Sequence, residues 1–181
     1  MAPDHVLFSE EQRFRQRWLW VLLIVAVAPI PPVFWYGVLR QVVGGHPWGS
    51  RPMSDAGLLT LAVLDTLFTV GLLALYWTAR LVTIVQSDGL LVRFRPFHLR
   101  PRRIDLSDVV SVEAVTYSPL RQYGGWGIRF GLGGRAYNVS GNRGVRLTRR
   151  SGRRLLIGSQ RPDELAAAVR RVWDATNRGA T

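Results

Sequence analysis

A single carboxylate, Asp65, interrupts a long apolar stretch of the sequence. An isolated acid in such a stretch can hydrogen-bond to polar groups of a neighbouring helix or carry a proton. Three prolines, Pro29, Pro31 and Pro32, interrupt a second apolar stretch at a similar distance from its end. A proline lacks an amide hydrogen and frees a carbonyl, so the backbone near it can interact with a polar side chain. Asp65 and the three prolines are therefore one candidate intramembrane polar site. The alternative is that Asp65 only joins two helices and the prolines only bend one of them.

Arginine is the second source of possible chemistry, because all 24 Lys and Arg residues are arginines. From Arg80 onward, 19 arginines outnumber 7 acids, so this part of the chain carries the whole net charge of +12. Anionic lipid headgroups attract basic clusters of this kind, although solvated turn arginines are the simpler interpretation. Nucleic-acid binding is not expected, because aromatic residues do not alternate with the arginines. The candidate anionic-surface contacts are Arg100, Arg102, Arg103, Arg149, Arg150, Arg153 and Arg154.

A glycine-rich loop supplies the third candidate, a surface for a protein partner. Tyr123, Trp126 and Arg129 lie in or beside this loop, and its paired glycines permit backbone angles that are closed to other residues. Trp126 can either anchor a partner or pack into the core of the domain.

The sequence gives no basis for catalysis. Its three histidines, His5, His46 and His98, are too far apart in the predicted topology to share a metal, and the chain has no cysteine. Asp105 and Asp108 are explained by alternation along a strand edge, and no nucleophile has a base at motif spacing. We therefore predict a protein that is not an enzyme and that has no cofactor or metal.

Two apolar stretches must position the first candidate site. Residues 18–39 and 56–79 are each long enough to cross a hydrocarbon layer of roughly 30 Å as a helix, joined by an outer loop at 40–55. Tryptophan and tyrosine at the ends of both stretches are typical of membrane interfaces. A cleaved signal peptide is the alternative for the first stretch, but Pro29 would directly follow the cleavage site. We predict two retained transmembrane helices.

The arginines also predict the orientation of these helices. Arg13, Arg15 and Arg17 precede the first helix, whereas the short connecting loop contains only Arg40 and Arg51. The positive-inside bias then places both termini in the cytosol and the protein in the inner (plasma) membrane. Residues 1–17 form a cytosolic segment in which Ser9 and Gln12 have the spacing of a capping box, so we expect the first helix to begin before the membrane.

Residues 80–178 form the predicted cytosolic domain. From Leu81 the apolar residues alternate, which is typical of strands, and Asp88-Gly89 indicates a tight turn between two of them. An amphipathic helix beginning near Pro162 ends the domain. The expected strands are Leu81–Val85, Leu90–Phe94, Arg103–Leu106, Val109–Tyr117, Trp126–Phe130, Ala136–Ser140, Gly144–Arg149 and Arg153–Gly158.

The hairpin at Gly144–Gly158, leading into Ser159–Leu165, resembles a pleckstrin-homology-like domain of the bacterial kind. Through Phe8–Gln16 and Tyr123–Arg129, the whole chain is similar to a family of uncharacterised prokaryotic membrane proteins with two N-terminal helices and such a domain. The resemblance implies about seven strands in two nearly orthogonal sheets that form a partly open barrel, with a C-terminal helix at one end. It implies no activity. Inositol-lipid recognition is not expected, since the first turn is only Asp88-Gly89 and lysine is absent.

We therefore predict an α+β integral membrane protein whose basic cytosolic domain mediates protein interaction or self-assembly at the inner leaflet. The alternative is a transport or sensing component that uses Asp65 and the break at residues 29–32. Replacement of Asp65 by Asn distinguishes them, because only the second function requires the carboxylate.

Overall fold

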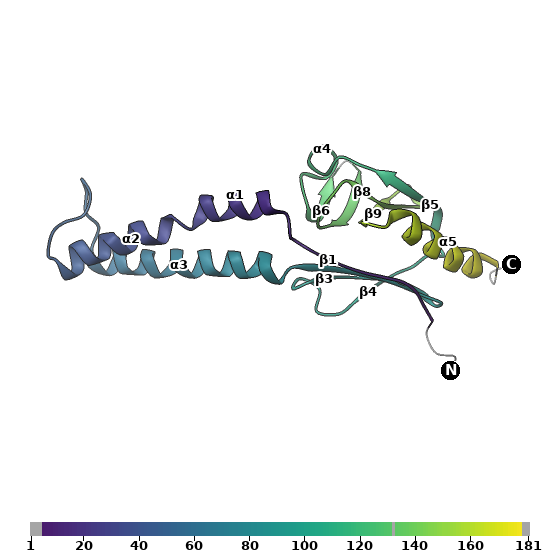
Figure 1. Cartoon of the computed structure of the whole chain (residues 1–181), viewed down its shortest axis with the longest axis horizontal. Helices are drawn as coiled ribbons and strands as arrows, with labels where there is room; N and C mark the ends of the chain where they lie inside the picture. The colour runs from purple at the N-terminus through teal and green to yellow at the C-terminus, as the bar shows by residue number, and fades with distance from the viewer. Residues whose placement is uncertain (1–4, 132, 179–181) are drawn as a thin grey trace. The chain divides into compact units, whose positions relative to one another are not determined.

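The computed structural model describes residues 5–131 and 133–178 and divides into two compact units. One unit is the helical hairpin, Arg15–Trp77. The other, here called the β unit, contains the described residues up to Phe14 together with those from Thr78 onward. The chain is therefore an α+β protein with two apolar helices and two sheets (Figure 1).

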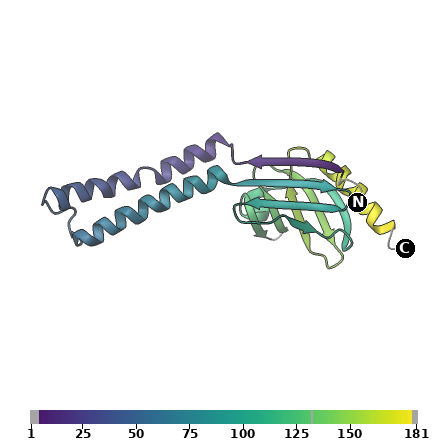
Figure 2. The same ribbon diagram turned by 90° about the horizontal axis from the view of Figure 1, so that it is seen from below.

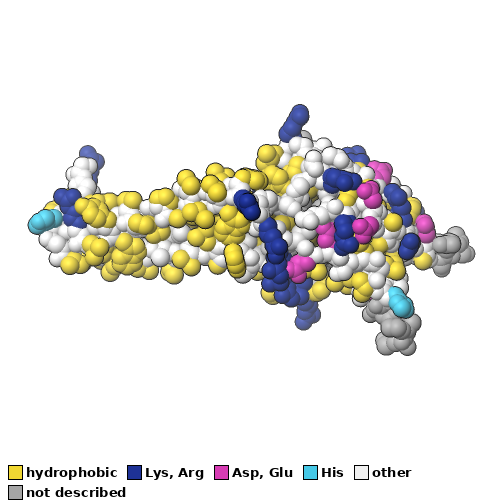
Figure 3. Space-filling model, viewed as in Figure 1, with side chains coloured by type: hydrophobic (Ala, Val, Ile, Leu, Met, Phe, Trp, Pro, Cys, Tyr) yellow, Lys and Arg dark blue, Asp and Glu magenta, His cyan; other side chains and the backbone are white. Residues whose placement is uncertain are grey.

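The first apolar helix of the hairpin is interrupted where the prolines predicted a break. It begins as α1 (Arg17–Val27), resumes after Ala28 and Pro29 as α2 (Ile30–Val38), and ends in a π-helical turn, Leu39–Val43. The second helix, α3 (Asp55–Thr78), is continuous. Both Arg17–Val43 and Asp55–Thr78 are long and apolar enough to cross a membrane, by length and composition alone. Hydrophobic side chains cover most of the visible surface of the hairpin (Figure 3).

The two helices of the hairpin pack in antiparallel register. Near the loop, Val38, Leu58 and Ala62 form a buried cluster with Phe34 and Trp48. Further along, the Trp35 indole donates a hydrogen bond to Thr66 Oγ1 at 2.9 Å. At the opposite end the rings of Trp20 and Trp77 meet edge to face at 5.9 Å.

Sheet A of the β unit is antiparallel, and its strand order is β1-β2-β3-β4. Alternate residues point inward, and Leu81, Val85, Val92 and Phe94 are among the buried ones. Figure 2 shows the N-terminal strand lying beside the teal strands of this sheet. The strands are β1 (Val6–Arg13), β2 (Arg80–Gln86), β3 (Gly89–Arg95) and β4 (Arg102–Ile104).

The expected helix start at Ser9 and Gln12 is wrong, because both residues belong to β1. Strand β1 alternates exposed and buried side chains, and its inward Glu10 and Gln12 bond to the segment before the last helix. Ser9 and Gln12 are three residues apart and lie on opposite faces of this strand, Ser9 exposed and Gln12 buried. Tertiary contacts of these residues, rather than local propensity, decide the structure.

Sheet B has the order β5-β8-β9-β7-β6, and only the β7–β9 pair is parallel. The short helix α4 (Pro119–Tyr123) and the C-terminal helix α5 (Pro162–Arg178) complete the unit. Helix α5 begins at the predicted proline and buries Leu165, Val169 and Val172. The strands are β5 (Val109–Thr116), β6 (Gly127–Gly131), β7 (Gly134–Asn138), β8 (Arg143–Arg149) and β9 (Arg154–Gly158).

The two sheets implied by the resemblance are present, but in the described part of the chain no strand of one sheet pairs with a strand of the other, so they form no closed barrel. Strand β4 is only three residues long, and it pairs with β3 alone. Helix α5 and the segment before it contact both sheets. On sheet B, Trp173 Nε1 donates to the carbonyl of Val109 at 2.9 Å and Arg170 Nε donates to that of Val112 at 3.0 Å. On sheet A, Glu10 accepts hydrogen bonds from Ser159 and Gln160, just before α5 begins.

Candidate functional site

A cavity of about 640 Å³ lies in the β unit where the two sheets fail to join. Strand β4 of sheet A forms one side of the cavity, and strands β6 to β9 of sheet B form the other. Among the described residues that line it, six are arginines and none is acidic. The lining residues are Arg102, Arg103, Ile104, Phe130, Gly131, Gly134, Arg135, Tyr137, Arg149, Arg153, Arg154 and Leu155.

Two of these arginines have carboxylate partners. Arg103 Nη1 lies 2.8 Å from Asp88 Oδ2, and Arg103 also donates to the Asp88 carbonyl. Arg149 Nη1 lies 3.7 Å from Asp108 Oδ2. Within residues 5–131 and 133–178, no carboxylate comes within 4.0 Å of the other four, Arg102, Arg135, Arg153 and Arg154. The cavity therefore holds four positive charges without an ion pair, and an anionic ligand would reduce their mutual repulsion.

Arg135 packs against two aromatic rings. Its guanidinium carbon lies 5.1 Å from the centre of the Phe130 ring and 4.8 Å from the centre of the Tyr137 ring. These contacts hold the side chain against two aromatic faces of the cavity lining. Its Nε is buried and has no hydrogen-bond partner. A buried donor without an acceptor costs free energy in the folded chain.

The two predicted arginine clusters meet at this cavity. Arg102 and Arg103 come from the first cluster, and Arg149, Arg153 and Arg154 from the second, although about fifty residues separate them in sequence. Arg100 and Arg150 are exposed and do not line it. Sequence reasoning missed Arg135. The available signal was the alternation that puts Arg135 and Tyr137 on one face of a strand.

His98 connects the cavity to the loop between β3 and β4. It is 6% exposed, and its ring meets that of Tyr137 edge to face at 5.5 Å. Its Nδ1 accepts a hydrogen bond from the amide of Phe94. Burial lowers the pKa of His98, and the positive charges of Arg102 and Arg135 lower it further.

Asp65 lies on the face of α3 that also carries the buried residues Ala62 and Thr69. Its Oδ2 is buried and has no hydrogen-bond partner. The adjacent Thr66 bonds to Trp35, which places Asp65 beside the turn of α2 that follows Pro31 and Pro32. Pro29 lies in the break between α1 and α2. The structure thus puts a carboxylate oxygen without a partner near the interrupted helix.

The third candidate surface is divided. Tyr123 is buried in a cluster with Tyr117, Ala136 and Leu156, so it is not available to a partner. Trp126 is half-buried, and its indole donates to the carbonyl of Gly141 at 3.0 Å. Arg129 is exposed and donates to the carbonyl of Trp126. Only part of the predicted surface is therefore accessible.

Residues 5–131 and 133–178 contain no group of three or more His, Asp or Glu side chains arranged to hold a metal ion. Comparison with family models, curated proteins and solved structures finds no match for the chain. Its function is therefore argued from the geometry of the β unit and the hairpin.

Proposed function

We propose that this chain is a non-enzymatic integral membrane protein whose cytosolic β unit binds an acidic segment of a partner protein in the arginine-lined cavity. The proposal rests on one observation: four arginines without carboxylate partners line a single cavity, and one of them has a buried donor without an acceptor. Arginine presents several donors in a plane that matches a carboxylate, so acidic side chains suit this lining.

The edge of sheet A favours an extended polypeptide. Strand β4 is the last strand of the sheet, and in the described part of the chain no strand pairs with its outer side. An incoming segment can add to that edge through its backbone while its acidic side chains meet the cavity arginines. Self-assembly through this face is disfavoured, because a second copy would bring arginines against arginines.

We also propose that Arg17–Val43 and Asp55–Thr78 span the inner membrane with both termini cytosolic. Under the same proposal the β unit is a variant of the pleckstrin-homology-like fold, in which an N-terminal strand joins the first sheet. Support comes from two sheets followed by one amphipathic C-terminal helix. An alkali wash that releases the chain from vesicles, or digestion of the β unit by protease added outside whole cells, would contradict this topology.

Photo-crosslinking in the cell's own membrane tests the binding function. A benzoylphenylalanine placed at Phe130, which lines the cavity, is expected to capture a recurrent protein. The double change Arg153→Gln and Arg154→Gln is expected to abolish this capture. The control, Arg121→Gln with Arg171→Gln, removes the same charge from exposed positions of α4 and α5 and is expected to retain it. Equal loss in both variants, or only lipid adducts in the unmodified protein, would contradict the proposal.

A second function, transport or sensing, is favoured by the buried Oδ2 of Asp65 that has no hydrogen-bond partner. A carboxylate in the hydrocarbon region is costly unless it is protonated or paired, so its retention at this place can serve ion or proton movement. Asp65→Asn distinguishes the two functions. If the binding function is right, the Asp65→Asn variant still captures its partner at position 130. If the transport or sensing function is right, the variant loses the cellular phenotype of the unmodified protein.

A further inference from the structure

Two large apolar side chains are exposed at the tip of the β3–β4 loop. Phe97 is 60% exposed and Leu99 is 84% exposed, and they are two residues apart. Arg95 and Arg100 flank them in sequence and are exposed as well. A loop that presents apolar residues between arginines has the composition of a segment that contacts an anionic lipid surface.

The loop has a fixed conformation despite its exposure. The guanidinium of Arg93 donates to the carbonyl of His98 at 3.2 Å and to that of Leu99 at 2.6 Å. The amide of His98 donates to the carbonyl of Phe94 at 2.7 Å, and His98 Nδ1 accepts from the amide of Phe94. These bonds hold Phe97 and Leu99 outward, so little conformational entropy is lost when they bind a surface.

This loop lies at the end of sheet A where the chain leaves for the hairpin and returns from it. In the sheet register, Arg80 pairs with Arg13 on one side and with Arg95 on the other. The Phe97 ring lies 6.1 Å from that of Phe94, and the Phe94 ring lies 6.5 Å from that of Phe14, the last residue of the β unit before the hairpin.

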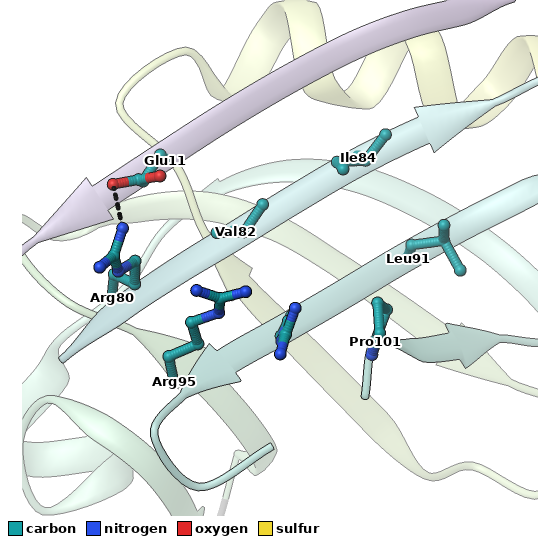
Figure 4. Close-up of a pocket in the computed structure, with 8 residues that line it drawn as sticks. Glu11, Arg80, Val82, Ile84, Leu91, Arg95 and Pro101 are labelled. Atoms are coloured by element: carbon teal, nitrogen blue, oxygen red, sulfur yellow. Dashed lines mark ion pairs between the residues drawn. The ribbon is translucent and has the colours of Figure 1, made fainter. Parts of the chain in front are cut away.

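Arginine side chains form a row across the outer face at the same end of the sheet. Figure 4 shows Arg80 and Arg95 on neighbouring strands, with Glu11 of β1 in an ion pair with Arg80. Arg13, Arg80 and Arg95 are cross-strand neighbours, and a single carboxylate, Glu11, accompanies them in the shallow groove beside the row. This end of the sheet is therefore both basic and, at its loop, apolar.

We infer that the β3–β4 loop inserts Phe97 and Leu99 into the cytosolic surface of the membrane, with the flanking arginines on lipid phosphates. The inference rests on the proposed membrane insertion of the hairpin. Three residues, 14–16, separate β1 from α1, and one, Ala79, separates α3 from β2. Such short connections keep this end of sheet A at the membrane surface if the helices span it. Apolar side chains there enter roughly 5–10 Å into the headgroup boundary.

The absence of cysteine permits a direct test with the full chain. Leu99→Cys is labelled with an environment-sensitive fluorophore, and the protein is reconstituted into vesicles of phosphatidylcholine and phosphatidylglycerol. Nitroxide groups placed at shallow or deep positions on the lipids then quench the label according to its depth. Val6→Cys, on an exposed apolar residue at the opposite end of sheet A, where Val6 pairs with Gln86, is the negative control, and Leu64→Cys, on the exposed surface of α3, reports the hairpin.

The expected result is blue-shifted emission at position 99 with quenching by the shallow nitroxide, no quenching at position 6, and quenching by the deep nitroxide at 64. If 64 is quenched but 99 is not, the loop does not touch lipid and the inference fails, although the hairpin spans. If position 6 is quenched as strongly as 99, lipid contact is not specific to the loop and the inference also fails. If 64 is not quenched, the proposed membrane insertion fails instead. A second variant, Phe97→Glu, is expected to abolish the blue shift at 99.

Discussion

The bonds between Glu10 and the start of α5 predict a large effect of a change far from that helix in sequence. Glu10 is 9% exposed; its Oε2 accepts from Ser159 Oγ at 2.5 Å and its Oε1 from the amide of Gln160 at 2.8 Å. Hydrogen bonds to a charged group contribute about 1.5–3 kcal/mol each. Glu10→Ala should therefore lower the free energy of unfolding of the β unit by about 3 kcal/mol, since paired losses are rarely additive.

The adjacent Glu11 supplies a matched control of the same residue type. It faces outward from the same strand, and its carboxylate lies 2.7 Å from Arg13 and 3.5 Å from Arg80 in exposed ion pairs. Exposed pairs contribute about 0–1 kcal/mol, so Glu11→Ala should change stability little. The two variants remove identical atoms and differ only in what the carboxylate contacts.

Hydrogen exchange of the full chain in detergent micelles, read by mass spectrometry, measures the difference locally. In Glu10→Ala, peptides from β1 and from the first turns of α5 should lose protection, whereas Glu11→Ala should resemble the unmodified protein. Ser159→Ala should add little to Glu10→Ala, because both changes remove the same bond. Equal protection in the two glutamate variants would refute the claim that Glu10 holds the start of α5 to sheet A.

Three further predictions concern other parts of the chain. The pKa of His98 in the folded chain lies below the unfolded value of about 6.5. The contribution of His98 to stability is therefore present above that pH and is lost as the pH falls toward the lowered pKa. His98→Gln should flatten this pH dependence, as measured by urea unfolding of the full chain. Burial raises the pKa of Tyr117 to about 12, so the difference in alkaline absorbance between the unmodified chain and Tyr117→Phe should have its midpoint near that pH. Ala62→Leu overfills the buried contact with Val38, and we expect a loss of about 1–3 kcal/mol in thermal unfolding of the hairpin, with exposed Leu64→Met unchanged.

Local patterns in the sequence were sufficient to predict the strands and helices whose side chains alternate between core and solvent. The proline break, the tight turn between β2 and β3 and the buried stripe of α5 were predicted because each depends on residues close together in the chain. The turn itself lies at Ser87-Asp88, one residue before the predicted Asp88-Gly89, and Gly89 begins β3. Strand β1 was not, because Glu10 and Gln12 find their partners at Gly158, Ser159 and Gln160. The two sides of that contact are far apart in the chain, so no short segment of the sequence contains both.

The candidate cavity shows the same division. Each arginine cluster was visible in the sequence, but their meeting depends on how β4 lies relative to sheet B. Strand alternation puts Arg135 on one face with Tyr137, but it does not show what that face contacts, and a single arginine on a strand is usually exposed. Its position between Phe130 and Tyr137 follows only from the pairing of β6 with β7, which brings Phe130 opposite Arg135.

The arginines that line the open junction between the sheets account for the failure of the sheets to join. A closed barrel would need β4 to pair with a strand of sheet B, and this would bring Arg102 and Arg103 against Arg135 and Arg154 at short range. Like charges at such distances oppose closure, and within residues 5–131 and 133–178 Asp88, the partner of Arg103, is the one carboxylate that pairs with any of these four arginines. An acidic segment that neutralises these arginines would remove the repulsion and supply the missing edge partner of β4. Under the proposed function, binding and closure of the gap are one event, and the cavity, rather than either cluster alone, is the functional unit.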